Sequence, residues 1–155
     1  YFSGERTPLH DPHAKGAYFG LDLTHTRADL YRATLEGIAM ATRQITDTFA
    51  AAGAPPTRVL AVGGGTRNQP WLQATSDVTG LPQTLCSVTT GAAFGNAFLA
   101  ALAVGAATPV DIERWNPVAA QVSVTAHPVY DHLYPLFRRL YTQTRDIAAE
   151  LGAAK

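Results

Sequence analysis

The chain has 155 residues, of which 46% are hydrophobic and 15% are charged, as in one folded globular domain and unlike a disordered chain. Lysine plus arginine equals aspartate plus glutamate, at 12 each, so the formal net charge is zero. That balance gives no electrostatic reason to expect binding to nucleic acid or to an anionic membrane.

Residues 1–26 form a predicted loop, because proline and glycine recur through them. A helix is expected from residue 27, with Thr26 as N-cap and Asp29 three positions later, as in a capping box. Gly53 is the expected C-cap of this helix. Apolar residues recur along it at spacings of three, four or seven, which puts them on one helical face: Tyr31, Leu35, Ile38, Ile45 and Phe49.

Two short strands and two further helices are expected next. Residues 58–62 form an apolar run without polar alternation, which predicts a strand buried on both faces. A helix follows from Asn68, its candidate N-cap, to about Val78, and residues 83–87 form the second predicted strand. Thr89 or Thr90 would cap a third helix over residues 91–104, whose small and apolar composition predicts that it is buried.

The remaining residues are expected to be mostly irregular until a final helix. Residues 108–127 contain one possible extended stretch, 121–124, and the last helix should run over about 129–151 with its arginines in solvent. Helices thus alternate with strands, which predicts an α/β layer structure containing a parallel strand pair.

The glycine run Gly63, Gly64 and Gly65 joins the first predicted strand to the second predicted helix. Glycines let the backbone approach a ligand closely, and a helix N-terminus favours anions, so the loop is a candidate nucleotide site. It has neither the P-loop pattern nor the dinucleotide fingerprint. A tight turn without any ligand is the alternative. Asn68 likewise can contact an adenine or ribose, or serve only as the N-cap.

Other polar residues carry weaker signals. Glu5 and Arg6 lie on a loop and indicate either a surface ion pair or a role between domains. His10 and His13 lack a third ligand nearby, so no metal site is predicted. Asp77 lies late in a predicted helix, which favours a structural hydrogen bond over a contact to Mg²⁺. Both tryptophans are expected in a core or interface.

Four blocks of sequence resemble the C-terminal domain of the FGGY carbohydrate kinases, and within that family the xylulokinases. The blocks cover nearly the whole chain in the expected order and include the long C-terminal signature of the family: residues 3–16 (SGERTP, DP and KG), residues 16–36 (GAYFGL and DLYRATLE), residues 63–82 (GGG with Trp71, Gln73, Asp77-Val78 and GLP), and residues 91–99 with the closing FRRLY of 137–141.

This resemblance implies an actin-like ATPase fold, in which two RNase H-like domains close on a cleft. Residues 1–155 would be a partial C-terminal, nucleotide-binding domain, with a loop over 1–26, a core of helices and strands over 27–107 and a last helix over about 129–151. In such kinases the backbone of Gly64 and Gly65 lies against the sugar and phosphates of ATP, and Asn68 lies at the adenine end. ATP and Mg²⁺ are the implied cofactors, and a sugar is the other substrate.

The catalytic aspartate, the phosphate loop and the sugar site would lie in residues upstream of Tyr1, mainly in an N-terminal sugar-binding domain. No catalytic residue is therefore assigned to this chain, and alone it is expected to be inactive. The implied reaction is phosphorylation of a ketopentose, D-xylulose to D-xylulose 5-phosphate first among the candidates. A non-catalytic actin-like module that binds nucleotide or acts as a scaffold is the alternative. An unpaired sheet edge would be completed by upstream residues or by a second copy, as in a homodimer.

The cellular setting implied by the sequence is the cytoplasm. Cys86 is the only cysteine and cannot form an internal disulfide. No apolar run is long enough to span a bilayer, and no signal peptide is evident. The first residue is Tyr1 and not methionine, which indicates a fragment or a processed product.

Overall fold

The structure is a computed structural model that describes residues 1–2 and 4–153. Ser3, which opens the first block of the family resemblance, lies outside them. A three-stranded sheet has the order β1-β2-β3, made by β1 (Val59–Ala61), β2 (Gln83–Cys86) and β3 (Val118–Val122). β1 runs parallel to β2, and β3 runs antiparallel to it. The prediction of a mixed α/β structure with a parallel strand pair is confirmed.

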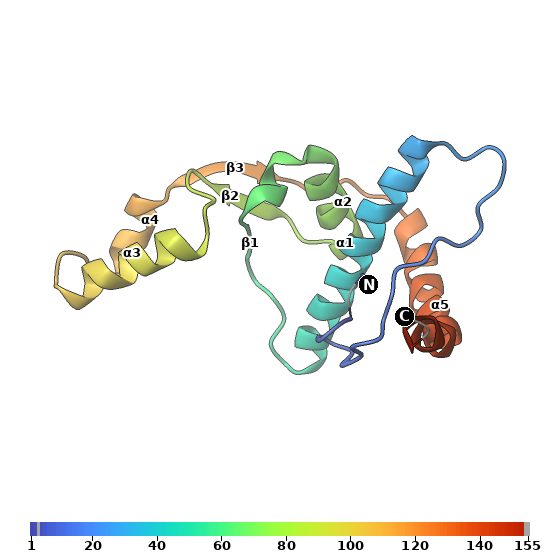
Figure 1. Cartoon of the computed structure of the whole chain (residues 1–155). Helices are drawn as coiled ribbons and strands as arrows, with labels where there is room; N and C mark the ends of the chain where they lie inside the picture. The colour runs from blue at the N-terminus through green and yellow to red at the C-terminus, as the bar shows by residue number, and fades with distance from the viewer. Residues whose placement is uncertain (3, 154–155) are drawn as a thin grey trace.

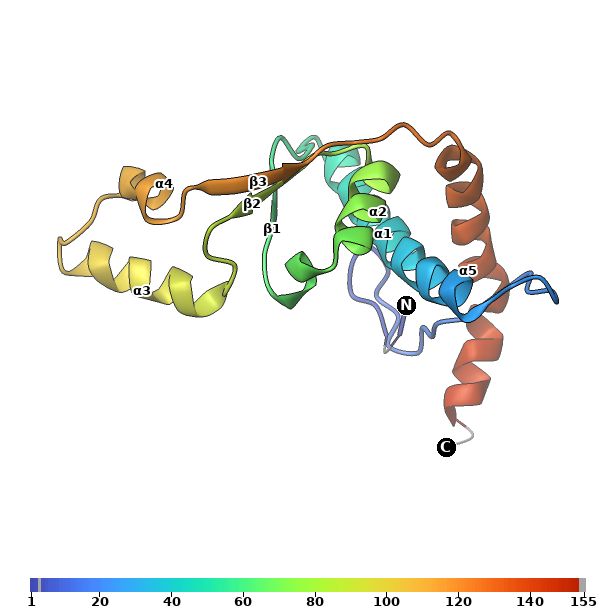
Figure 2. The same cartoon turned by 90° about the horizontal axis from the view of Figure 1, so that it is seen from above.

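Three helices pack against one another beside this sheet (Figures 1 and 2): α1 (Arg27–Ala51), α2 (Gln69–Thr79) and α5 (Val129–Ala153). The hydrophobic core lies between them, with Leu133 and Phe137 packed against it. It consists of Ala39, Met40, Ala74, Val78, Tyr130 and Tyr134. The core is therefore a contact among helices, to which α2 contributes Ala74 and Val78.

The predicted start of α1 is confirmed at atomic detail. Both the backbone N–H and the hydroxyl of Thr26 donate to Oδ2 of Asp29, each at 2.7 Å. These bonds favour the ionised carboxylate and lower the pKa of Asp29. The helix ends before Gly53, which has a φ of 80° and so occupies the left-handed region that glycine tolerates.

The apolar face predicted for α1 is buried only along part of its length. Leu35 is buried and Ile38 and Ile45 are half-buried, but Tyr31 and Phe49 are 54% and 50% exposed. Helical spacing places the five side chains on one side of α1 without specifying how far the neighbouring helices extend along it. Tyr31 lies near the N-terminal end of α1, where its hydroxyl finds a polar partner described below.

Two predictions of burial are wrong. In the described residues β1 is an edge strand whose one neighbour is β2, and Leu60 is 43% exposed. α3 (Ala92–Ala103) begins after Gly91, not at a capping threonine, and Phe98 is its one buried residue in the described chain. Figures 1 and 2 show α3 projecting away from the core beside α4 (Ile112–Trp115). The apolar composition of α3 favours burial against another segment. Among the described residues, however, no segment covers most of this helix.

The segment expected to be mostly irregular contains more structure than predicted. It holds a 3-10 turn, η2 (Pro109–Asp111), as well as α4 and the whole of β3. β3 begins three residues before the extended stretch expected from 121 to 124, and most of its side chains are exposed. Its pairing with β2 is what fixes this strand, and such a long-range contact leaves no periodic signal in the sequence. Among the described residues, no helix has the length and apolarity needed to span a membrane.

Candidate functional site

The glycine run follows β1 directly and turns the chain towards α2. Its last two glycines begin η1, a 3-10 turn over Gly64–Arg67, and Gly63 is the N-cap of this turn. The N–H of Gly63 donates to the carbonyl of Thr89 at 2.7 Å, which ties the run to the segment after β2. Thr66 closes the turn, since its hydroxyl donates to the carbonyl of Gly63 at 2.7 Å. The loop is therefore fixed by hydrogen bonds at the carboxyl end of a parallel strand, where α/β proteins place ligands.

Two of the three glycines are required by the structure, each for a different reason. Gly63 has a φ of 84°, which strains any other residue. A Cβ on Gly65 would lie 2.7 Å from Cζ3 of Trp71, so the tryptophan ring leaves no room for a side chain. A Cβ on Gly64 would meet nothing within 4 Å, and its φ is not positive. Turn geometry and packing thus account for Gly63 and Gly65, while Gly64 has no such intramolecular requirement.

Asn68 is confirmed as the N-cap of α2. Its Oδ1 accepts from the backbone N–H of Trp71 at 3.2 Å. Because a backbone N–H can only donate, this bond fixes which end of the amide carries the oxygen. The amide nitrogen Nδ2 points the other way and donates to the hydroxyl of Tyr31 at 2.6 Å. Asn68 therefore caps α2 with its oxygen and contacts α1 with its amide nitrogen.

Tyr31 is the residue at this loop that sequence reasoning missed. It belongs to α1, 37 positions before Asn68, and it was assigned to the apolar helical face. Its hydroxyl accepts from Asn68, and no described residue accepts the phenolic proton. The only signal available was a phenol at the N-terminal end of an amphipathic helix, which does not indicate a partner.

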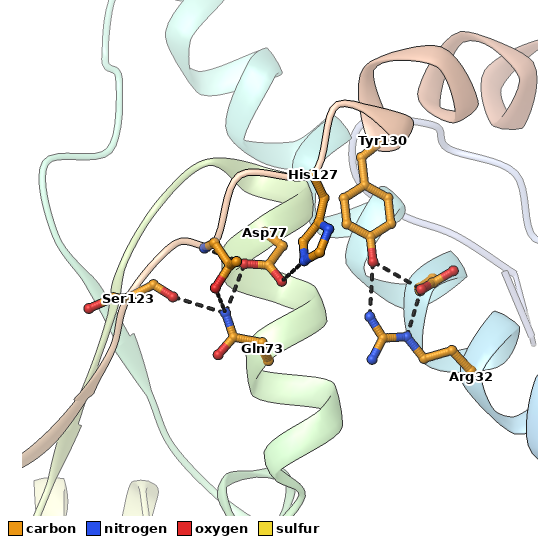
Figure 3. A network of polar contacts seen from close by, with 8 residues as sticks. Arg32, Gln73, Asp77, Ser123, His127 and Tyr130 are labelled. Atoms are coloured by element: carbon orange, nitrogen blue, oxygen red, sulfur yellow. Dashed lines mark hydrogen bonds and ion pairs between the residues drawn. The ribbon is translucent and has the colours of Figure 1, made fainter.

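Asp77, near the C-terminal end of α2, takes part in a polar network (Figure 3). Its Oδ1 accepts from Nε2 of Gln73 at 2.8 Å and from the backbone N–H of Thr125 at 2.7 Å. Gln73 also donates to the carbonyl of Ser123 at 3.0 Å. The network holds the segment between β3 and α5 against α2, as expected of a structural hydrogen bond.

A second polar cluster joins α1 to α5, also visible in Figure 3. Nε of Arg32 lies 2.6 Å from Oε1 of Glu36, and the hydroxyl of Tyr130 bonds to both residues at 2.9 Å. Burial is the largest cause of the raised pKa of Tyr130. Arg32 and Glu36 belong to the signature that carries the family resemblance, so part of that signature stabilises helix packing.

The N-terminal loop contains an open hollow lined by Gly4, Glu5, Arg6, His10 and Pro12. The carboxylate of Glu5 accepts from the backbone N–H of Arg6 at 2.8 Å, and the two side chains form no ion pair in the described chain. An interdomain role for this pair remains a prediction. His10 and His13 are exposed, and residues 1–2 and 4–153 contain no group of three potential metal ligands.

Both tryptophans lie in aromatic or backbone contacts. Trp71 packs against Gly65. Trp115 of α4 meets Phe98 edge-on with ring centroids 5.2 Å apart, and Phe94 at 6.5 Å.

Known proteins resemble this chain along its whole length. Residues 1–104 match the FGGY family of carbohydrate kinases, C-terminal domain. The chain is 32% identical to the xylulose kinase of Bacillus subtilis (strain 168), with 97% of this chain and 31% of that protein covered. It is 34% identical to a ribulokinase of Mycolicibacterium smegmatis, with 90% and 28% covered.

The same relationship holds in three dimensions. The crystal structure of xylulose kinase from Rhodospirillum rubrum superimposes with a TM-score of 0.79 at 33% identity, covering 96% of this chain and 30% of that one. The chain therefore spans about a third of the length of the relatives it matches.

Proposed function

The chain belongs to the FGGY family of carbohydrate kinases, and we propose that it is the ATP-binding half of a kinase that transfers the γ-phosphoryl group of ATP to a sugar hydroxyl. Its fold is the actin-like ATPase fold of that family. The site that binds the nucleotide is the glycine run with Asn68. ATP is the donor substrate, and residues 1–155 supply its binding surface.

The observation that carries this proposal is the open position of Gly64. Turn geometry explains Gly63 and the ring of Trp71 explains Gly65, but no described residue lies within 4 Å of a Cβ on Gly64. A ligand that approaches the backbone closely gives glycine an advantage there. The position lies between a strand end and a helix N-terminus, which together favour a nucleotide with its phosphates.

The donor set of the loop suits an anion. Residues 62–69 contain backbone N–H groups, an arginine and an asparagine, but no carboxylate. Asp77 is unsuited as a ligand for Mg²⁺, because its Oδ1 already accepts two hydrogen bonds and the side chain is buried. We propose that Mg²⁺ reaches the enzyme on the phosphates of ATP, where it neutralises charge during phosphoryl transfer.

The acceptor we propose is D-xylulose, which would become D-xylulose 5-phosphate. The support is the similarity to xylulose kinases over most of this chain. Ribulose, gluconate and glycerol are the competing acceptors, and the ribulokinase relative keeps the first of them open. The residues that choose among them belong to the N-terminal sugar-binding domain, which we propose as the partner of this one.

Location and assembly follow from the same proposal. A kinase that uses ATP and a free sugar would work in the cytoplasm, and a lone thiol such as Cys86 suits that reducing compartment. The exposed side chains of β1 and α3 would be covered by other parts of the full-length kinase or by a second copy in a homodimer.

The test uses the full-length kinase that carries this domain. The expected result is ATP-dependent phosphorylation of D-xylulose, and little or none by residues 1–155 alone, because phosphoryl transfer depends on positioning groups from both domains. Gly64→Ala should raise the KM for ATP by about tenfold or more without changing the thermal midpoint. Gly152→Ala is the control, since its added methyl also meets nothing within 4 Å and lies at the far end of α5.

Three results would count against the proposal in different ways. Absence of ATP binding to the wild type would refute it. ATP binding without turnover of any sugar would favour the non-catalytic actin-like module. An unchanged KM in Gly64→Ala would show that the glycine run is a turn and not the nucleotide site.

A further inference from the structure

The hydroxyl of Tyr31 contacts Asn68, three residues after the glycine run. It accepts from Nδ2 of Asn68 at 2.6 Å, and no acceptor for its own O–H lies among the described residues. The tyrosine is 54% exposed although it sits on the helix that forms much of the core. The phenolic oxygen accepts one hydrogen bond and its proton has no acceptor among the described residues, so the hydroxyl can donate to a bound ligand.

Asn68 presents a second donor beside it. Its Oδ1 is engaged by the N–H of Trp71 as the cap of α2, and one of the two N–H bonds of Nδ2 is engaged by Tyr31. One amide N–H therefore remains. The hydroxyl of Tyr31 and the amide of Asn68 are in direct contact, so their two donors can bind neighbouring acceptors of one ligand.

We propose that Tyr31 is a nucleoside-contacting residue of the ATP site, and that it also positions the amide of Asn68. The two donors suit acceptor atoms of a nucleoside, such as the ring nitrogens of adenine or the ribose oxygens. The phosphates would lie instead along the backbone of the glycine run and the N-terminus of α2. This inference rests on the proposed function, because it takes the bound ligand to be ATP.

Two independent features support a ligand role over a purely structural one. A hydrogen bond between half-exposed side chains adds little to stability, because water replaces it readily. The cap of α2 also does not need Tyr31, since Oδ1 alone makes the capping bond. The Tyr31–Asn68 bond does restrict the rotation of the amide about its last side-chain torsion, so the remaining N–H keeps a fixed direction.

The experiment compares Tyr31→Phe with Tyr18→Phe in the full-length kinase. Tyr18 is a matched control, because it is 53% exposed and its hydroxyl also bonds to α1, at Thr34 2.5 Å away. Each variant loses one exposed phenolic oxygen and keeps its ring. ATP affinity is measured by calorimetry, and adenosine and inorganic tripolyphosphate are measured as competitors of ATP.

Tyr31→Phe should weaken ATP and adenosine by about fivefold, the factor that corresponds to one hydrogen bond. Binding of tripolyphosphate should be unchanged, kcat should be retained, and Tyr18→Phe should match the wild type throughout. Equal weakening of adenosine and tripolyphosphate would mean that Tyr31 only supports the loop, and unchanged ATP and adenosine affinity would remove it from the site. Either result overturns this inference while the wild type still binds ATP. Failure of the wild type to bind ATP would overturn the proposed function and this inference together.

Discussion

Nε2 of His127 lies 3.7 Å from Oδ2 of Asp77, and that carboxylate oxygen is buried without a hydrogen-bond partner among the described residues (Figure 3). His127 is half exposed and meets the ring of Tyr130 edge-on at 5.9 Å. The pair therefore lies at the junction where the segment after β3 passes from α2 to the start of α5. Oδ1 of Asp77 accepts two hydrogen bonds, whereas Oδ2 accepts none among the described residues and faces the imidazole.

The first prediction separates the two oxygens of Asp77. Asp77→Ala should lower the free energy of unfolding by about 2–3 kcal/mol, because it removes the acceptor of Gln73 and of the Thr125 N–H. Asp77→Asn should cost less than about 1 kcal/mol, since its oxygen can still accept both bonds. Urea unfolding measures both, with Asp146→Ala as an exposed control. Equal losses for Ala and Asn would show that the charge, and not the acceptor, matters.

The second prediction concerns alkaline pH. Burial, followed by the hydrogen bond from its hydroxyl to Asp47, raises the pKa of Tyr134 to about 12, and burial likewise raises that of Tyr1 to about 12. The neutral phenols are thus favoured in the folded state. Their contribution is complete below pH 10, the unfolded pKa, and is lost as the pH rises to about 12.

Tyr134→Phe should therefore be less stable than the wild type near pH 8, because the bond to Asp47 is gone. Its stability should also fall less steeply between pH 10 and 12. Denaturant unfolding at several pH values measures both effects. Parallel curves for the two proteins across this range would contradict the assignment of the alkaline loss to Tyr134.

The third prediction concerns packing beneath the glycine run. Gly65→Ala would place a methyl 2.7 Å from Cζ3 of Trp71, so the ring must shift, at a cost of about 1–3 kcal/mol. Gly64→Ala should be nearly neutral for stability, because its methyl meets nothing. Thermal unfolding and tryptophan fluorescence report the two effects. Equal destabilisation by Gly64→Ala and Gly65→Ala would contradict this prediction, because the contact with Trp71 would then not be the cause.

The local elements were largely predictable because their signals are local. Thr26 and Asp29 define the start of α1 through bonds within four residues, and Asn68 defines α2 in the same way. The glycine run was located by its place between an apolar strand and a capped helix. Its nucleotide role followed from the family resemblance and stays a proposal.

Features set by distant partners were not predictable. β3 was misplaced by three residues because only its register against β2 defines it. α3 was expected to be buried, but composition cannot tell which segment provides the cover. The contact between Tyr31 and Asn68 joins residues 37 positions apart, and helical spacing groups Tyr31 only with the apolar residues of α1.

The last prediction tests whether capping and ligand binding can be separated at Asn68. Asn68→Asp keeps an oxygen that accepts from the Trp71 N–H, and a negative charge at a helix N-terminus is favourable, so the thermal midpoint should be unchanged or higher. The amide donors are lost, however, and the carboxylate repels the phosphates of ATP. Affinity for ATP should fall by about tenfold or more.

Asn68→Ala should instead lose about 1 kcal/mol of stability with the cap, and it should weaken ATP binding less, because it introduces no charge. Raising the salt concentration screens the repulsion, so it should bring the ATP affinity of the aspartate variant closer to that of the wild type. The ratio of the affinities of the alanine variant and the wild type should not change with salt. Wild-type affinity in Asn68→Asp would confine Asn68 to its capping role and leave the nucleoside to be bound by other residues of the loop.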